Sequence, residues 1–343
     1  MDLAVQRVTY RLRAPVAAAW GTVRGREVLR VRVREGGLVG VGEAAPLPGY
    51  DSPPDGLASA EAALANAAGE PRLEAALERA GASSPHARAA LDTAAWDLRG
   101  QREGSPVARL LAGDRDPVEG REQAALPGAV PVNALVSGGD RAGASREAAQ
   151  ATAAGFRCLK VKVGTGDDAG RLAAVRAAVG PDVAIRVDAN GAWTVDEALA
   201  TLRALEPVGI ELCEEPVHGV EGLRTVRARS GVPISMDESG WEAGAVGSGA
   251  ADVVCLRVGR LGGIGAAMEA AAAARAAGAD VYVASTFDGP AGVAAALHVA
   301  AALGVTRPCG LATLGLFEGL EDPFPPRDGE IAVPQAPGLG AGA

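Results

Sequence analysis

The chain has 343 residues, of which 48% are hydrophobic and 22% charged, and its formal net charge is −9. This composition allows a large buried core, and the negative charge argues against an extensive nucleic-acid-binding surface. At roughly 150 residues per domain, the length indicates about two domains. The sequence contains no apolar run long enough for a membrane span and no signal-peptide core. We therefore expect a cytoplasmic protein without nucleic-acid or membrane partners.

Nearly all of the basic residues are arginines. Lys and Arg total 33, and only Lys160 and Lys162 are lysines. A chain rich in Ala, Gly and Arg is expected to exchange lysine for arginine wherever only a positive charge is needed. The surviving pair therefore indicates a place that requires an ammonium group, because an arginine does not give up its proton.

Residues 1–125 are predicted to form an α+β domain. Residues 28–33 (VLRVRV) and 38–48 (LVGVGEAAPLP) predict antiparallel strands. A helix is predicted to begin at Pro85, with Ser84 as its N-cap, because serine caps helices well and proline fits the first helical position.

Residues 126–313 show a different pattern, in which short β-rich runs alternate with alanine-rich helical segments. Such alternation predicts parallel strands, and eight units are enough to close a barrel, with an open doubly wound sheet as the alternative. Residues 314–343 are rich in Pro and Gly, and we expect them to return to the N-terminal domain. The eight strand candidates are residues 130–136, 158–164, 184–191, 210–217, 233–239, 252–258, 280–286 and 309–313.

Carboxylates lie at the ends of three successive strand candidates. Asp188, Glu214 and Asp237 are separated by 26 and 23 residues, about one strand–helix unit each. Polar groups at the carboxyl ends of parallel barrel strands meet at one mouth, so we expect these three to be neighbours. Each alone would more simply be a helix cap or a surface charge. Three converging carboxylates require a cation, however, and Mg²⁺ prefers oxygen ligands.

The two lysines are expected at the same mouth. Residues two apart share one face of a strand, so Lys160 and Lys162 should point the same way. An ammonium group nearby lowers the proton affinity of a lysine, which would allow Lys162 to act as a base. The simpler interpretation is a pair of solvated strand residues, but it leaves the position of these two lysines unexplained.

Taken together, these motifs resemble the enolase superfamily over almost the whole chain. The resemblance implies a (β/α)7β TIM-like barrel under an α+β capping domain built from both ends of the chain. It also implies that Asp188, Glu214 and Asp237 bind Mg²⁺, with Mn²⁺ as the alternative ion, and that Lys162 is a catalytic base tuned by Lys160. The matching segments are GEAAPLPGYD (42–51), ALDTAAWDLRGQ (90–101), LKVKVG (159–164), RVDANGAW (186–193), CEEPV (213–217), SMDES (235–239) and RLGG (260–263).

Within the superfamily, two activities fit parts of the sequence. Residues 42–51, 130–136 and 309–316 look most like o-succinylbenzoate synthases of menaquinone biosynthesis. Such an enzyme abstracts the proton α to a carboxylate and then expels a β-hydroxyl as water in a syn elimination. Residues 285–292 (STFDGPAG) are similar to dipeptide epimerases and related racemases, which are the alternative.

Arg257 departs from the superfamily pattern, in which the sixth barrel strand normally carries a further lysine. Racemisation with two bases requires a proton acceptor on each face, whereas arginine stays protonated. A syn dehydration can use one lysine as base and then as acid, which leaves the opposite cation an electrostatic or cation–π role. Arg257 therefore favours the synthase. A homologue that binds a carboxylate without turnover is the remaining hypothesis.

The partner is expected to be a small-molecule carboxylate substrate, and the oligomeric state is left open, a homo-oligomer included. Glu215 is expected to point away from the mouth and to play a structural role. The residues that we expect to contact substrate are Asn190, Ser285, Thr286 and Trp20.

Overall fold

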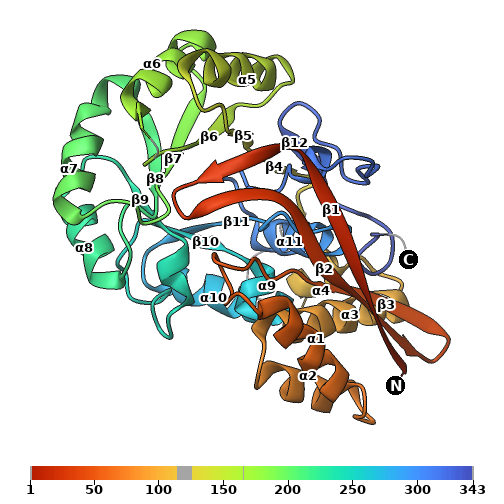
Figure 1. Ribbon diagram of the computed structural model, residues 1–343. Coiled ribbons are helices and arrows are strands. Elements are labelled where there is room, and N and C mark those ends of the chain that lie inside the picture. Colours follow the sequence, from red (N-terminus) through yellow and green to blue (C-terminus); the bar gives the residue numbers. More distant parts are fainter. Residues whose placement is uncertain (1, 114–125, 165, 342–343) are drawn as a thin grey trace, which may run out of the picture.

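The computed structural model describes residues 2–113, 126–164 and 166–341. It shows an antiparallel sheet with helices on one side and a curled parallel sheet with helices outside it (Figure 1). The domain boundary predicted at residue 125 falls at the end of 114–125, which lies outside the described residues. In the part of the chain that is described, no helix is long and apolar enough to cross a membrane.

The N-terminal strands form the predicted antiparallel sheet, in the order β1–β2–β3. Strand β3 packs directly on a helix, because a Cβ at Gly42 would lie 1.8 Å from the carbonyl oxygen of Ala90. The close approach explains why this strand needs glycine. The elements are β1 (Asp2–Ala18), β2 (Gly21–Glu35), β3 (Leu38–Ala44), α1 (Gly56–Ala67), α2 (Leu73–Gly81), α3 (Pro85–Glu103) and α4 (Val107–Gly113).

Helix α3 links this domain to the barrel. It begins where the sequence predicts, with Pro85 in its first turn and the Ser84 hydroxyl accepting the Ala87 N–H at 3.2 Å. The Asp92 carboxylate accepts the Ile264 N–H at 2.6 Å and so caps a barrel helix. The helix is therefore shared by both domains.

The parallel sheet has the order β11–β10–β9–β8–β7–β6–β5, which follows the sequence strand by strand. Its strands are β5 (Ala134–Val136), β6 (Cys158–Lys162), β7 (Ala184–Asp188), β8 (Ile210–Glu214), β9 (Ile234–Met236), β10 (Val253–Leu256) and β11 (Asp280–Val283). The helices are α5 (Arg141–Ala153), α6 (Asp168–Val179), α7 (Val195–Ala204), α8 (Val220–Arg229), α9 (Val258–Leu261), α10 (Ile264–Ala276) and α11 (Pro290–Leu303).

Backbone pairing at residues 309–310 closes the sheet into a barrel. Cys309 bridges Val132 and Gly310 bridges Ala284, both in parallel. The eighth strand candidate thus joins the two ends of the seven-stranded sheet, which confirms the expected (β/α)7β architecture. One connection differs, because the segment between β9 and β10 contains the 3₁₀ helix η2 (Glu238–Trp241) and no described α-helix. Four glycines between residues 239 and 251 make a longer helix unfavourable there.

The C-terminal segment contacts both domains. Strand β12 (Glu330–Ala332) pairs with β4 (Ala129–Pro131) at the start of the barrel. Phe317 bridges Leu12 of the capping sheet, and the Gly338 carbonyl accepts the N–H of Val107.

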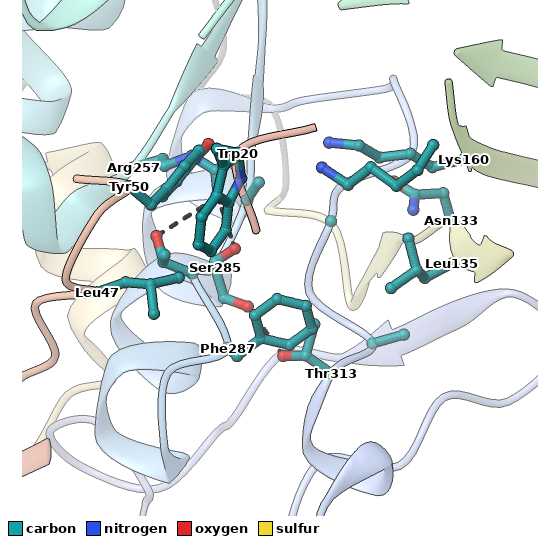
Figure 2. Close-up of a pocket in the computed structure, with 15 residues that line it drawn as sticks. Trp20, Leu47, Tyr50, Asn133, Leu135, Lys160, Arg257, Ser285, Phe287 and Thr313 are labelled. Carbon is teal, nitrogen blue, oxygen red and sulfur yellow. Dashed lines mark hydrogen bonds between the residues drawn. The ribbon is translucent and has the colours of Figure 1, made fainter. Parts of the chain in front are cut away.

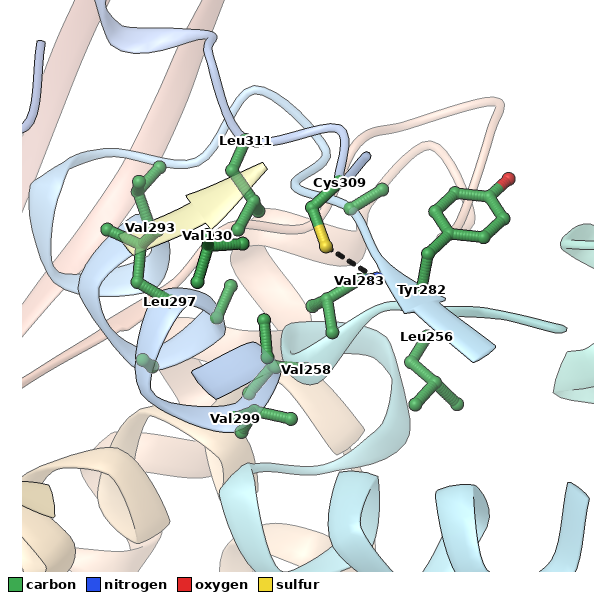
Figure 3. Close-up of a cluster of buried hydrophobic side chains, with 14 of the residues drawn as sticks. Val130, Leu256, Val258, Tyr282, Val283, Val293, Leu297, Val299, Cys309 and Leu311 are labelled. Carbon is green, nitrogen blue, oxygen red and sulfur yellow. Dashed lines mark hydrogen bonds between the residues drawn. The ribbon is translucent and has the colours of Figure 1, made fainter. Parts of the chain in front are cut away.

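The largest core cluster lies between α11 and the closing strands of the barrel. Val283, Val293, Leu297 and Leu311 pack there, as Figure 3 shows. All four cysteines are buried and free.

A buried arginine holds the capping domain against the barrel. The Arg26 guanidinium donates to the carbonyls of Ala45 at 2.5 Å and Pro46 at 3.0 Å, and also to Phe287 at 3.4 Å. These carbonyls belong to two loops of different domains. Arg26 therefore ties the loop at residues 45–52, which we call the cap loop, to the loop that follows barrel strand β11.

Glu43 lies beside this junction with an incomplete set of partners. One carboxylate oxygen accepts the Gly289 N–H at 2.6 Å, and the other is buried without a partner. Burial and the charge of Asp288 raise the pKa of Glu43 to about 8. Folding therefore favours the protonated acid at neutral pH.

We expect Glu43 to make stability fall as pH rises. Its folded pKa of about 8 exceeds the ordinary 4.5, so its stabilising contribution is complete below about pH 4.5 and is lost as pH rises towards 8. Glu43→Gln should remove a slope of up to about 1.4 kcal/mol per pH unit. Urea unfolding of both proteins at pH 5, 6.5 and 8 measures it. Equal slopes would contradict the assignment.

Candidate active site

Strand register brings the predicted carboxylates and lysines together. Lys162 pairs with Asp188 across β6 and β7, and Asp188 pairs with Glu214 across β7 and β8. Glu214 in turn pairs with Ser235, two residues before Asp237. The three carboxylates are almost completely buried, as expected for groups that converge inside one barrel mouth.

The lysines bind the carboxylates directly. Lys160 Nζ lies 2.6 Å from Glu214 Oε2 and 2.8 Å from Asp188 Oδ2. Lys162 Nζ lies 2.6 Å from the same Asp188 oxygen and donates to Asn190 Oδ1 at 2.8 Å. The expected proximity of the two ammonium groups is confirmed, since they share one oxygen.

Arg257 occupies the opposite side of the carboxylates. Its Nε donates to Asp237 Oδ1 at 2.8 Å and its Nη2 to Asp237 Oδ2. Its Nη1 donates to the Ser285 carbonyl at 2.7 Å and approaches the Thr286 hydroxyl at 3.5 Å. The guanidinium also lies 5.4 Å from the centre of the Tyr50 ring. These contacts fix Arg257 as a stationary cation.

Two tyrosine hydroxyls complete the set of donors. Tyr50 of the cap loop donates to Asp237 Oδ2 at 2.8 Å, and Tyr282 of β11 donates to Glu214 Oε2 at 2.7 Å. The whole chain has three tyrosines. Two of them therefore donate to carboxylates of this cluster.

The neighbouring cations affect the pKa values of the three acids unequally. Burial opposes ionisation of all three acids, but Lys160 and Lys162 outweigh it at Asp188 and Arg257 outweighs it at Asp237, so the pKa of each is lowered. Burial and the charge of Asp188 raise the pKa of Glu214 to about 7. Further positive charge at this position would therefore stabilise the ionised cluster.

The three acids have the donor chemistry of a site for a hard divalent cation, and Glu214 and Asp237 offer oxygens within 4.8 Å of each other. Each carboxylate has one oxygen that accepts two donors, namely Asp188 Oδ2, Glu214 Oε2 and Asp237 Oδ2. The other oxygen accepts one backbone N–H in Asp188, one guanidinium N–H in Asp237 and no hydrogen bond in Glu214. Each acid thus retains an oxygen lone pair, and carboxylate oxygens are the ligands that Mg²⁺ prefers.

Glu215 supports the cluster from behind. As expected, its side chain points away from the mouth, where it accepts the N–H groups of Asp237 at 2.8 Å and Ser239 at 2.9 Å. Its φ of 40° is positive, as are those of Asn190 and Phe287. Positive φ is costly for residues with side chains and is often found at functional sites.

A pocket opens in front of the cations, and Figure 2 shows Lys160 and Arg257 on opposite sides of it. The predicted contacts Ser285, Thr286 and Trp20 line it, whereas Asn190 is not among the lining residues and accepts a hydrogen bond from Lys162. No carboxylate is among the described residues that line it. They are Trp20, Leu47, Tyr50, Asn133, Leu135, Lys160, Lys162, Arg257, Ala284, Ser285, Thr286, Phe287, Gly310, Ala312 and Thr313.

Several residues of the site were not predicted from the sequence. Tyr282 could have been found, because it shares its strand face with Thr286 by alternation. Tyr50 and Leu47 lie in the segment GEAAPLPGYD, but nothing local shows that this loop reaches the barrel.

Comparison with protein families gives matches over both domains. The model described as "Mandelate racemase / muconate lactonizing enzyme, N-terminal domain" matches residues 1–112. The model described as "Enolase C-terminal domain-like" matches residues 143–342.

Individual relatives have different activities. A hydrophobic dipeptide epimerase of Enterococcus faecalis is 31% identical over 89% of this chain and 88% of its own length. An o-succinylbenzoate synthase of Thermobifida fusca is 40% identical over 60% of this chain and 66% of its own length. The crystal structure of the dipeptide epimerase from Enterococcus faecalis V583, complexed with Mg and the dipeptide L-Leu-L-Tyr, superimposes with a TM-score of 0.88. It is 28% identical and covers 99% of this chain and 98% of its own.

We expect Glu215→Ala to destabilise the protein by about 2–6 kcal/mol. The substitution leaves two buried backbone N–H groups without partners, at roughly 1–3 kcal/mol each. Urea unfolding measures the loss. Glu221→Ala is the control, because that exposed side chain contacts only Arg224 and its removal should cost less than about 0.5 kcal/mol. Equal stability of the two variants would contradict the role of Glu215.

Proposed function

The chain belongs to the mandelate racemase/muconate lactonizing enzyme branch of the enolase superfamily, and from that premise we propose that it is an o-succinylbenzoate synthase. Asp188, Glu214 and Asp237 would hold Mg²⁺ at the barrel mouth. Lys162 would be the base, and Lys160 and Arg257 fixed cations on either side of the substrate.

The charge of the pocket is the observation that carries the proposal. Lys160, Lys162 and Arg257 line it, and its described lining includes no acid. o-Succinylbenzoate carries two carboxylates and no amine, so a positive pocket suits it and the precursor from which it forms. A dipeptide carries an ammonium group, and burying that group beside three cations without an acidic partner is unfavourable.

The proposed reaction is an elimination of water in which one lysine acts first as the base and then as the acid. Neutral Lys162 takes the proton from the carbon α to the ring carboxylate. The electrons of that C–H bond form the new double bond as the β-carbon loses its hydroxyl, and Lys162 returns the proton to the departing oxygen, which leaves as water. A divalent ion bound at the three acids would supply positive charge for the carboxylate whose charge increases as the proton leaves.

Lys160 and Arg257 provide charge without exchanging protons. Burial opposes the ammonium form of Lys160, but Asp188 and Glu214 outweigh it and raise its pKa above the ordinary value. Arg257 is held by Asp237 and by the Ser285 carbonyl. We assign the proton transfer to Lys162 alone, an arrangement that a syn elimination tolerates and a two-base racemisation does not.

Dipeptide epimerase is the second candidate. The relative in Enterococcus faecalis aligns over 89% of this chain, more than the synthase of Thermobifida fusca does. The cationic pocket and Arg257 count against this activity. A non-catalytic carboxylate-binding role is disfavoured because Lys162 and all three acids are retained in hydrogen-bonded positions.

An absorbance assay with the cyclohexadiene precursor of o-succinylbenzoate tests the proposal. We expect conversion with Mg²⁺ and its loss on addition of a chelator. A dipeptide panel analysed on a chiral column serves as the comparison. Epimerised dipeptides without dehydration would favour the second candidate, and inactivity towards both substrate classes would favour the binding protein.

We expect both Lys162→Ala and Lys162→Arg to lower kcat by at least about 100-fold, because neither residue can accept the proton. The arginine variant separates loss of the base from loss of the charge. Calorimetric titration should show that Mg²⁺ still binds to both variants. Substantial turnover by either would disprove the assignment of Lys162.

Arg257→Ala should lower kcat by roughly 100-fold or more, whereas Arg257→Lys should retain dehydration, because a cation remains. Proton NMR in D₂O shows whether the α-proton of a substrate is exchanged on one face or on both. The wild-type protein should not exchange the α-proton of both enantiomers of an amino-acid derivative. Exchange on both faces would show that a second base is present and that the single-lysine scheme is wrong.

A further inference from the structure

Tyr50 occupies a position at which both domains meet the acid cluster. It follows Pro48 and Gly49 in the cap loop, and its hydroxyl reaches Asp237, 187 residues further along the chain. Its ring lies 5.0 Å from Trp20, at the tip of the β1–β2 hairpin, and 5.2 Å from Trp241 in η2. One side chain thus contacts the hairpin, the barrel and a carboxylate of the cluster.

The hydroxyl acts on a defined oxygen of Asp237. Oδ2 accepts both the Tyr50 hydroxyl and Arg257 Nη2, whereas Oδ1 accepts only Arg257 Nε. Two donors thus occupy Oδ2, whereas Oδ1 keeps a lone pair that could bind the proposed ion. Partners that orient a ligand in this way typically contribute about 10- to 100-fold to metal affinity.

Hydrogen bonds within the cap loop fix Tyr50 relative to the rest of that loop. Asp51 Oδ1 accepts the Leu47 N–H at 2.6 Å, and Tyr50 N–H donates to the Leu47 carbonyl at 3.0 Å. Arg26 fastens the start of the loop to Phe287 of the barrel. Movement of the cap loop would therefore carry the hydroxyl away from Asp237.

We propose that Tyr50 is a positioning residue that couples ion binding at Asp237 to the seating of the cap loop and the Trp20 hairpin over the pocket. The inference rests on the proposed ion site. Coupling of this kind is reciprocal: a seated cap raises the affinity for the ion, and the bound ion holds the cap. Tyr50 does not itself contact the reacting atoms in this assignment.

Magnesium titration of the full chain tests the coupling, by calorimetry and by tryptophan fluorescence. Tyr50→Phe keeps the ring and removes the hydroxyl, so Mg²⁺ affinity should fall about 10- to 100-fold. Tyr10→Phe is the matched control. It removes another cap hydroxyl, which contacts Arg30 and no acid of the cluster, and it should bind as the wild type does.

The tryptophan signal distinguishes the two parts of the proposal. Mg²⁺ should change the fluorescence of the wild type, and Trp20→Phe should reduce that change while leaving the affinity the same. Mg²⁺ should also slow tryptic cleavage at Arg13 and Arg24, which flank the hairpin tip, in the wild type but not in Tyr50→Phe. The responses of the wild type to Mg²⁺ can be measured whether or not the variants fold.

The outcomes distinguish a failure of the proposed Tyr50 coupling from a failure of the proposed ion site. If the wild type binds no Mg²⁺, the ion site is wrong and the coupling falls with it. If Tyr50→Phe binds Mg²⁺ as tightly as the wild type, the ion site stands and the role of Tyr50 is wrong. If affinity falls but fluorescence and cleavage do not respond to Mg²⁺, Tyr50 only orients Asp237 and the coupling to the cap is disproved.

Discussion

Three buried carboxylates in one barrel mouth are the constraint on which the rest of the site depends. Asp188, Glu214 and Asp237 have at most 1% of their surface exposed. Such charges are costly to desolvate unless each has close partners. Lys160 and Arg257 meet this requirement from opposite sides, and two tyrosine hydroxyls donate to carboxylate oxygens that these cations also contact. The remaining oxygen lone pairs give the cluster its capacity for a further cation.

The same arrangement determines what the pocket can accept. The cations that pair with the acids also line the pocket, whereas the acids are not among its described lining residues. The charged side chains that line the pocket are therefore all positive, although the chain as a whole is negative. This contrast in charge favours a dicarboxylate substrate over a dipeptide. Overall similarity does not decide between them, because a relative of each kind is similar to the chain.

The capping domain is part of the site and does more than cover it. Tyr50 and Trp20 reach the pocket from this domain, and Arg26 joins its loop to the loop that follows β11. The junction buries two ionisable groups, Glu43 as well as Arg26, so the stability of the protein should depend on the protonation of Glu43.

The sequence by itself determined the barrel, the positions of the acids and the rarity of lysine. These features are local: strand and helix periodicity depends on near neighbours, and alternation places Lys160 and Lys162 on one face. Only the tertiary structure decided that Lys162 shares Asp188 with Lys160, that Arg257 is held by Asp237, and that the cap loop reaches the cluster. The hydrogen bond between Tyr50 and Asp237 spans 187 residues, and such a contact depends on how two domains pack, which no local pattern encodes.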